Sequence, residues 1–252
     1  MKEKASKSSQ KSNKTKQNTT KKSFSIYALA SGKPGKKFTI KQFLEITKNA
    51  KKKPGGSNTS RTIKLNDGYI YEADSQQEIS TLKKLMSHDS FKRLRGQCIS
   101  IPYRYGGKDH NYYPDFIMLT HTNKIVIMEV KEVAQMCTKQ NIKKYEALKR
   151  YCARNGYLYI MCDKAFIPYE RLEDYEYHSP IVDAAIEKAL SEKGKFDYND
   201  YKLLIEGKDH KRVKKIRKSI GVYIASHKKE VKEVGDLYFK VETFQIRYKK
   251  KK

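Results

Sequence analysis

The sequence predicts an α/β fold in which a mixed central sheet is flanked by helices, with a small, mainly helical region toward the C-terminal end. Three features predict it. Two strongly apolar runs, YYPDFIML at 112–119 and IVIMEVK at 125–131, are joined by the short polar segment THTNK. A basic stretch at 139–155 has apolar side chains at helical spacing, and the apolar run YLYIMC follows it. The predicted order is helix, three strands, helix, strand, or αβββαβ.

A hairpin and a helix are predicted ahead of these runs. Between residues 61 and 73, apolar and polar residues alternate on both sides of the turn sequence Asn-Asp-Gly at 66–68, which favours a tight hairpin. Ser75 has Glu78 three residues later, the spacing of a capping box at a helix N-terminus. We therefore expect Glu78 in the first turn of a helix.

The first strand of the predicted sheet lies at 97–105, where Ile99, Ile101 and Tyr103 fall on one side. Pro102 indicates an edge position or the end of the strand, because proline cannot donate a ladder hydrogen bond. The runs at 112–119 and 125–131 then form an antiparallel hairpin that is buried on both faces.

A helix over 139–155 and a final strand complete the predicted core. Ile142, Tyr145, Leu148 and Tyr151 recur at helical spacing. Gly156 ends the helix before the strand YLYIMC, since glycine readily adopts the left-handed conformation of a helix C-terminus.

Composition divides the chain into four regions. Residues 1–22 are rich in Lys, Ser, Thr, Asn and Gln without an apolar period, which is typical of a disordered basic arm. Residues 23–60 form an N-terminal extension with a short helical period at 38–49 and a loop, KKKPGGSNTS. The core follows at 61–168.

Residues 169–252 form a basic C-terminal region. It offers two or three helices, in IVDAAIEKALSEK, YNDYKLLIEG and HKRVKKIRKSIGVYIASHKK, and a terminal hairpin around Gly235 with strands in DLYFKVE and FQIRY. Helices followed by a hairpin would suit a winged-helix reader of DNA.

Charge indicates the class of partner. Lys and Arg total 55 against 28 Asp and Glu, a net charge of +27, which favours binding to a polyanion such as DNA. An anionic membrane surface is the alternative. The basic residues are spread through the chain instead of lining one amphipathic helix, and no segment approaches the ~20 apolar residues of a membrane span. The N-terminus lacks the apolar run of a secretory signal, so we expect a cytoplasmic, nucleoid-associated or nuclear protein without membrane contact.

The cysteines predict neither a zinc site nor a disulfide framework, because they lie far apart with no CxxC spacing. They are Cys98, Cys137, Cys152 and Cys162. We expect reduced and mostly buried thiols.

Two acidic residues interrupt the apolar hairpin. Asp115 and Glu129 lie among Phe, Ile, Met, Leu and Val, where an ionised carboxylate is unfavourable unless a cation or a hydrogen-bond donor compensates it. Strand side chains alternate between faces, so Glu129 and Lys131 point to the same side. In a tight hairpin the start of the first strand lies beside the end of the second, which brings Asp115 near both.

These groups suit a divalent metal acting on DNA. Mg²⁺ prefers oxygen ligands and keeps several waters, so two carboxylates and phosphate oxygens make a workable site for Mg²⁺ or Mn²⁺. The metal would activate water and neutralise charge on the phosphate. Lys131 would orient the water, deprotonate it or stabilise the developing charge, and the sequence leaves these roles open. Glu78 would complete the metal shell.

A simpler interpretation exists for each strand alone. Asp115 would end a turn after Pro114, and Glu129 and Lys131 would form an ordinary charged patch on a sheet edge. This interpretation is weaker for the two strands together, because ordinary sheets rarely gather several charged groups within adjacent apolar strands. The pattern favours metal-dependent hydrolysis of DNA.

The order Glu78, Pro114-Asp115 and Glu129-Val130-Lys131, on helix, strand and strand, resembles the PD-(D/E)xK nuclease superfamily. The chain is most similar to the N-terminal catalytic domain of TnsA-type transposon endonuclease subunits. The segments that carry this resemblance are SRTIKLNDGYIYEADSQQE, YYPDFIM, IVIMEVK and KYEALKRYCARNGYLYIMCDKAFI, between about residues 60 and 170.

The resemblance implies a restriction-endonuclease-like core, a winged-helix-like C-terminal region and a partner transposase subunit. It implies Glu78, Asp115 and Lys131 as the catalytic acid, acid and lysine, with Glu129 at the second acidic position of the motif. Glu78, Asp115 and Glu129 would be the metal ligands.

Two questions stay open. Basic residues of the predicted helix over 139–155 either contact the DNA backbone or form a solvated face; they are Lys143, Lys144, Lys149 and Arg150. The function could also be that of a standalone restriction, defence or recombination nuclease, or of a non-catalytic basic protein that binds DNA.

Overall fold

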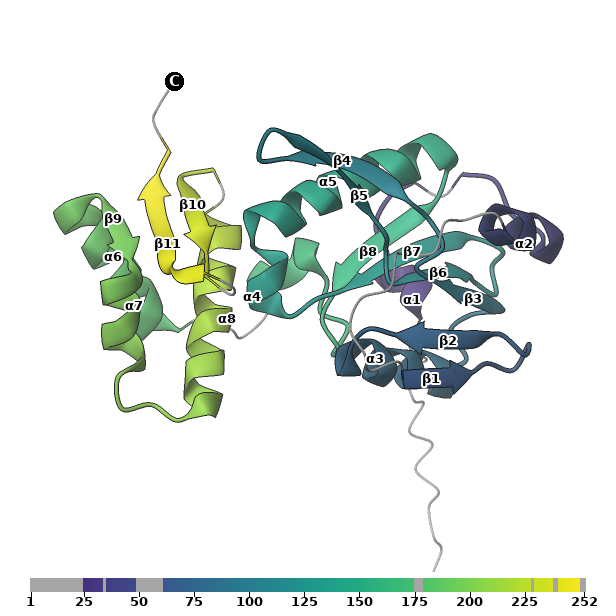
Figure 1. The fold of residues 1–252 in the computed structure, drawn as a ribbon, viewed down its shortest axis with the longest axis horizontal. Coiled ribbons are helices and arrows are strands. Elements are labelled where there is room, and N and C mark those ends of the chain that lie inside the picture. Colours follow the sequence, from purple (N-terminus) through teal and green to yellow (C-terminus); the bar gives the residue numbers. More distant parts are fainter. Residues whose placement is uncertain are drawn as a thin grey trace, which may run out of the picture.

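A computed structural model of the chain describes residues 25–33, 35–48, 61–174, 179–227, 229–237 and 240–249. Its centre is a mixed four-stranded sheet in the order β3-β6-β7-β8 (Figure 1). The strands are β3 (Arg93–Gly96), β6 (Phe116–Leu119), β7 (Ile125–Val130) and β8 (Leu158–Cys162). β6 pairs antiparallel with β3 and β7, whereas β7 pairs in parallel with β8. The predicted α/β fold with a mixed sheet is confirmed.

Helices cover both faces of this sheet, and β6 and β7 are buried throughout. On one face, Leu82 and Leu85 of α3 (Gln76–Ser87) belong to one hydrophobic cluster. On the other face, Leu148 of α5 (Lys139–Asn155) belongs to a second. The apolar character of both strands is explained by this burial on two sides.

The predicted hairpin and helix cap precede the sheet. β1 (Arg61–Lys64) and β2 (Ile70–Ala73) pair antiparallel. Gly68 in the turn between them has a φ of 81°, which favours glycine. Ser75 caps α3, because its hydroxyl accepts a hydrogen bond from the backbone N–H of Glu78 at 3.2 Å.

The predicted first strand of the sheet was wrong. The sheet begins with β3, whereas residues 101–105 form β4 (Ile101–Tyr105), which pairs with β5 (Lys108–Tyr112) in a separate ribbon. Ile101 and Tyr103 are buried in the hydrophobic cluster that contains α5. The alternation of Ile101 and Tyr103 therefore results from the packing of the β4–β5 ribbon against α5.

The turn of this ribbon and the break after it were also not predicted. Gly106 and Gly107 have φ values of 59° and 79°, as a tight hairpin turn requires. The run at 112–119 is divided, since β5 ends at Tyr112 and β6 begins at Phe116. Asp115 lies in the break.

The N-terminal extension packs against the core. It contains α1 (Ile26–Leu29) and α2 (Ile40–Lys48), and the second confirms the helical period predicted at 38–49. Phe43 of α2 is fully buried in the cluster that contains α5. The predicted basic arm at 1–22 and the loop after α2 lie outside the described residues.

Short helices surround α5. α4 (Val133–Met136) follows β7, and the 3₁₀ helix η1 (Tyr169–Asp174) follows β8. α5 ends at Gly156 with φ 69° and ψ 31°, the left-handed conformation that the sequence predicts.

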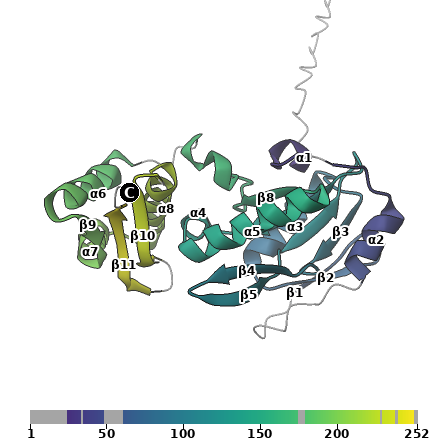
Figure 2. The same cartoon turned by 90° about the horizontal axis from the view of Figure 1, so that it is seen from above.

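The C-terminal region has its own hydrophobic cluster, built around Ile186, Phe196, Ile220 and Phe244. Its helices are α6 (Pro180–Lys193), α7 (Tyr198–Ile205) and α8 (His210–Ser226), and its strands are β9 (Lys195–Asp197), β10 (Val231–Asp236) and β11 (Lys240–Tyr248). The strands form an antiparallel sheet in the order β10-β11-β9, beside the helices (Figure 2).

The terminal hairpin differs from the prediction. β10 precedes the predicted strand at 236–242, residues 240–248 form one strand, and β9 was not predicted. Gly235 lies at a bulge in β10, where its φ is 79° and a Cβ would lie 2.1 Å from the Thr243 carbonyl oxygen. The glycine that indicated a turn therefore allows close approach of two strands.

The C-terminal region meets the core where α8 lies beside α4 (Figures 1 and 2). A Cβ at Gly221 of α8 would lie 3.1 Å from Cα of Ala134, so the two helices approach closely at this glycine.

All four cysteines are free and buried, as predicted. No helix in the described ranges is long and apolar enough to cross a membrane.

Candidate active site

Asp115 lies directly beside the end of β7. Its Oδ2 accepts a hydrogen bond from the backbone N–H of Val130 at 2.7 Å, and its own backbone N–H donates to Glu129 Oε2 at 3.3 Å. The register pairs Phe116 with Met128, which sets Asp115 opposite Glu129. The proximity expected from hairpin geometry is present.

Lys131 joins the two carboxylates. Its Nζ lies 2.6 Å from Glu129 Oε1 and 3.8 Å from Asp115 Oδ2. Both acidic residues are buried, but 25% of the Lys131 side chain is exposed. Lys131 is therefore the most exposed side chain of this cluster.

Two tyrosines orient the acidic side chains. Tyr112 donates a hydrogen bond to Glu129 Oε2 at 3.0 Å, and Tyr71 donates to Glu78 Oε2 at 2.7 Å. The sequence analysis did not identify them, because nothing in the pattern separated these two from the other tyrosines, 19 in all. The only available signal was the position of Tyr112 just ahead of Pro-Asp.

Glu78 is held at the start of its own helix. Besides Tyr71, its carboxylate accepts hydrogen bonds from the Ser75 hydroxyl at 2.8 Å and from the Asp74 backbone N–H at 3.2 Å. α3 covers one face of the sheet, whereas Tyr112 belongs to the cluster on the other face. The hydrogen bonds of the Glu78 carboxylate are thus made within its own helix cap and with Tyr71, and its charge acts on Asp115 and Lys131.

The pKa values show an excess of negative charge. Burial, and then the charges of Glu129 and Glu78, raise the pKa of Asp115 well above its usual value, although Lys131 opposes this. Burial would lower the pKa of Lys131, but Asp115 and Glu129 outweigh it and raise that pKa above its usual value. The site contains three carboxyl groups and one ammonium group, so a further cation would relieve the imbalance.

The types of side chain in this cluster suit a divalent metal, but their positions in the structure do not form a complete metal site. Within the part of the chain that the structure describes, no three Asp, Glu, His or Cys side chains are grouped closely enough to hold a metal ion. Asp115 and Glu129 offer the oxygen ligands that Mg²⁺ prefers. Glu78 would have to turn from its cap, or phosphate and water oxygens would have to supply the remaining positions.

The predicted DNA-binding residues are spread around α5. Lys143, Lys149 and Arg150 are exposed, and Lys143 pairs with Glu146 at 2.8 Å. Lys144 Nζ lies 5.9 Å from the ring centroid of Tyr112, so it is the one of the four next to a residue of the site. Their contact with DNA stays a prediction.

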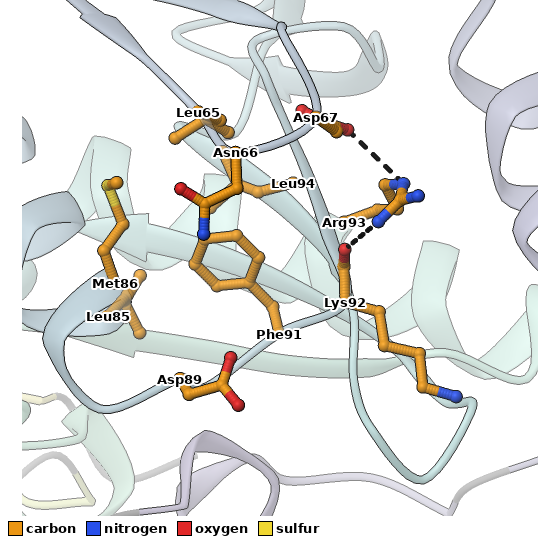
Figure 3. A pocket seen from close by; sticks show the side chains of 10 residues that line it. All are labelled: Leu65, Asn66, Asp67, Leu85, Met86, Asp89, Phe91, Lys92, Arg93 and Leu94. Atoms are coloured by element: carbon orange, nitrogen blue, oxygen red, sulfur yellow. Dashed lines mark hydrogen bonds and ion pairs between the residues drawn. The ribbon is translucent and has the colours of Figure 1, made fainter.

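Two hollows in the described surface lie away from these residues. One of about 150 Å³ lies between the β1–β2 turn and the end of α3, where Asp67 Oδ2 is 3.4 Å from Arg93 Nε (Figure 3). Another of about 630 Å³ lies between α2 and the residues Tyr69 and Arg95. Neither of these two hollows includes Asp115.

Comparison with known families agrees with this chemistry. Residues 88–164 match the family described as TnsA-like endonuclease N terminal. This segment resembles the N-terminal domain of TnsA-like endonucleases. A comparison with curated proteins gives no match.

The TnsA-like segment extends from the end of α3 to the residues just after β8. It contains Asp115, Glu129 and Lys131, whereas Glu78 precedes it. The predicted resemblance is confirmed over this segment, and the sheet flanked by helices is the restriction-endonuclease-like fold that it implied. The likeness to this endonuclease family covers residues 88–164, about a third of the chain.

Proposed function

We propose that this protein is a metal-dependent endonuclease that hydrolyses phosphodiester bonds of DNA. The observation that carries the proposal is the contact of the Lys131 ammonium group with the carboxylates of Asp115 and Glu129 inside a TnsA-like segment. Such a buried group of charges is unfavourable for a sheet and is typical of a reaction site.

Each residue has a role in the proposed reaction. Asp115 and Glu129, joined by Glu78, would hold Mg²⁺ or Mn²⁺, which supplies an activated water and positive charge at the phosphate. Lys131 is charged at neutral pH because its acidic neighbours raise its pKa, so it enters the reaction as a donor. It would bind a phosphate oxygen or the attacking water and stabilise the transition state, in which the water attacks phosphorus and a P–O bond breaks.

The basic character of the chain supports DNA as substrate. The net charge is +27, and α8 carries the exposed cations Lys211, Arg212 and Lys215 near its N-terminus. The order helix, strand, helix, helix, strand, strand of the C-terminal region supports the winged-helix-like character proposed for it. In such a domain these side chains would contact phosphates.

The test is a cleavage assay on plasmid DNA with Mg²⁺, with Mn²⁺ and with EDTA. Wild type is assayed alone and with a transposase that acts on ends carried by the plasmid, and it should cut only when a divalent metal is present. Asp115→Ala and Lys131→Ala should bind DNA with the wild-type affinity without cutting it. Undiminished cutting by either variant, with contaminating nuclease excluded by a second purification, would contradict the assignment.

The resemblance to transposon endonucleases favours a subunit of a heteromeric transposase over a standalone nuclease. A subunit should cut transposon-end DNA only when a transposase that acts on the same ends is present. A standalone restriction, defence or recombination nuclease would cut alone. A protein that binds DNA with metal and with a transposase, but never cuts it, would be the non-catalytic binder.

A further inference from the structure

Glu132 connects three parts of the molecule. It directly follows Lys131, and its Oε1 accepts a hydrogen bond from Gln77 Nε2 at 3.0 Å. The same oxygen lies 2.6 Å from Nζ of Lys214, a residue of α8 in the C-terminal region. Gln77 adjoins Glu78 in the first turn of α3. One carboxylate oxygen thus contacts the helix of Glu78 and the C-terminal region, one residue away from Lys131.

We propose that Glu132 is a positioning residue, through which Lys214 of α8 fixes Lys131 and Glu78 relative to each other. The inference rests on the proposed nuclease function. Glu132 is mostly covered, since 15% of its side chain is exposed, whereas its neighbour Lys131 lies at the end of β7 where the strand ladder no longer holds the chain on both sides. A charge-assisted bond at this point therefore limits the movement of the catalytic lysine.

The packing of α8 supports this role. Gly221 lies seven residues after Lys214, about two helical turns, so both residues lie on the same face of α8. Gly221 approaches Ala134 of α4, and α4 begins immediately after Glu132. The helix is therefore held at two points against the segment that follows Lys131, and it is not free to rotate without moving that segment.

The arrangement also gives the C-terminal region an influence on the reaction. Lys211, Arg212 and Lys215 are exposed on the same helix as Lys214. A DNA phosphate bound by these cations would fix α8, and α8 would fix Glu132. In this scheme binding by the C-terminal region raises the rate of cleavage and not merely the local concentration of DNA.

The experiment compares Lys214→Met and Glu132→Ala with the matched control Lys188→Met, in the full chain with Mn²⁺. Rates are measured below and above saturation with DNA. We expect Lys214→Met and Glu132→Ala to lower the saturated rate on the order of tenfold with little change in KM. Lys188→Met should leave the saturated rate unchanged, because its side chain is exposed on α6 and pairs with Glu192.

Exchanging the charges separates positioning from simple loss of stability. In the double variant Glu132→Lys with Lys214→Glu, the ion pair is reversed, and Gln77 can rotate its amide to accept from lysine. The double variant should recover most of the rate that either single change removes. A saturated rate in Lys214→Met equal to that of wild type would overturn the inference.

Hydrogen exchange gives an answer even if no cleavage is found. In the protein without DNA, Lys214→Met should speed exchange of the amides in 131–136, and Lys188→Met should not. Wild-type exchange in Lys214→Met would overturn the inference, whatever the activity. The proposed function fails separately, if wild type cuts no DNA either alone or with a transposase, or if Lys131→Ala cuts as wild type does.

Discussion

The candidate active site and the exposed face of α8 use charge in opposite ways. Asp115 and Glu129 are buried in a sheet and touch Lys131, so the position of each charge is fixed by the others. Lys211 and Lys215 extend into solvent, where their charge attracts a polyanion but fixes little geometry. The contrast separates two tasks. Reaction chemistry requires charges at fixed positions, whereas capture of DNA requires only a large number of positive charges.

The largest expected effect comes from removing the cation of the buried cluster. Lys131→Ala removes the only cation that the structure places against Asp115 and Glu129 within the described residues. We expect single-turnover cleavage to fall by about 10²–10⁴-fold with unchanged DNA affinity. Lys188→Ala, at an exposed lysine of α6, is the control and should keep its rate. A smaller loss than tenfold would show that Lys131 does not act on the reacting phosphate.

The second prediction concerns the exposed cations of α8. In this variant Lys211, Arg212 and Lys215 are all changed to Gln. We expect affinity for DNA to fall on the order of tenfold at moderate salt, and the slope of log affinity against log salt to decrease by about 2–3. Affinity and salt slope are measured by fluorescence anisotropy. Unchanged values would assign DNA capture to another surface, such as α5.

The third prediction concerns stability, and its sign follows from the pKa of Asp115. Burial and two acidic neighbours raise this pKa above the usual 3.8, so the folded protein holds the proton more tightly than the unfolded chain does. The favourable contribution is therefore present below pH 3.8 and is lost as pH rises through the raised pKa.

Above pH 3.8 the raised pKa of Asp115 makes this residue unfavourable for the folded protein relative to the unfolded chain, and at neutral pH Asp115→Asn should raise the free energy of unfolding by about 1 kcal/mol. Asparagine can still accept the bond from Val130. Thermal unfolding in EDTA between pH 4 and 8 tests this. We expect the advantage of the variant to shrink toward acid pH, and Mg²⁺ to stabilise wild type more than the variant. A lower melting temperature for the variant at pH 8 would contradict the prediction.

The smallest effect is expected from Tyr112→Phe, which removes the hydrogen bond to Glu129. The loss corresponds to about 1 kcal/mol, or several-fold in cleavage rate. Tyr103→Phe is a matched control, because Tyr103 lies on the same ribbon but its hydroxyl accepts from Gln140. Equal rates in the two variants would show that Tyr112 does not orient Glu129 for the reaction.

The sequence predicted the parts of the site that follow from strand periodicity. Alternation placed Glu129 and Lys131 on one side, hairpin pairing brought Asp115 to them, and the cap at Ser75 placed Glu78 in a first helical turn. These features depend on neighbours close in sequence or directly paired. Tyr71, Tyr112 and the pair of Glu132 with Lys214 depend on tertiary packing between distant segments, which no local period encodes.

The fold errors have a similar cause. β3 has the sequence RLRG, with one apolar side chain that is fully buried, so it gave no strand signal. The clearer alternation of Ile101 and Tyr103 belonged to the ribbon against α5 instead. Periodicity identifies side chains that are buried together, but it does not say whether a sheet or a helix buries them. The turn predicted at Gly235 was wrong because glycine is found at β-bulges as well as at turns.

The pairing of β7 on both edges has a consequence for how activity can be lost. β7 is bonded to β6 on one side and to β8 on the other, and a slip by one residue would turn Glu129 away from Asp115. Such a slip would also expose the apolar side chains that hold the sheet together. A shift of register would therefore remove the proposed activity and the packing of the sheet together.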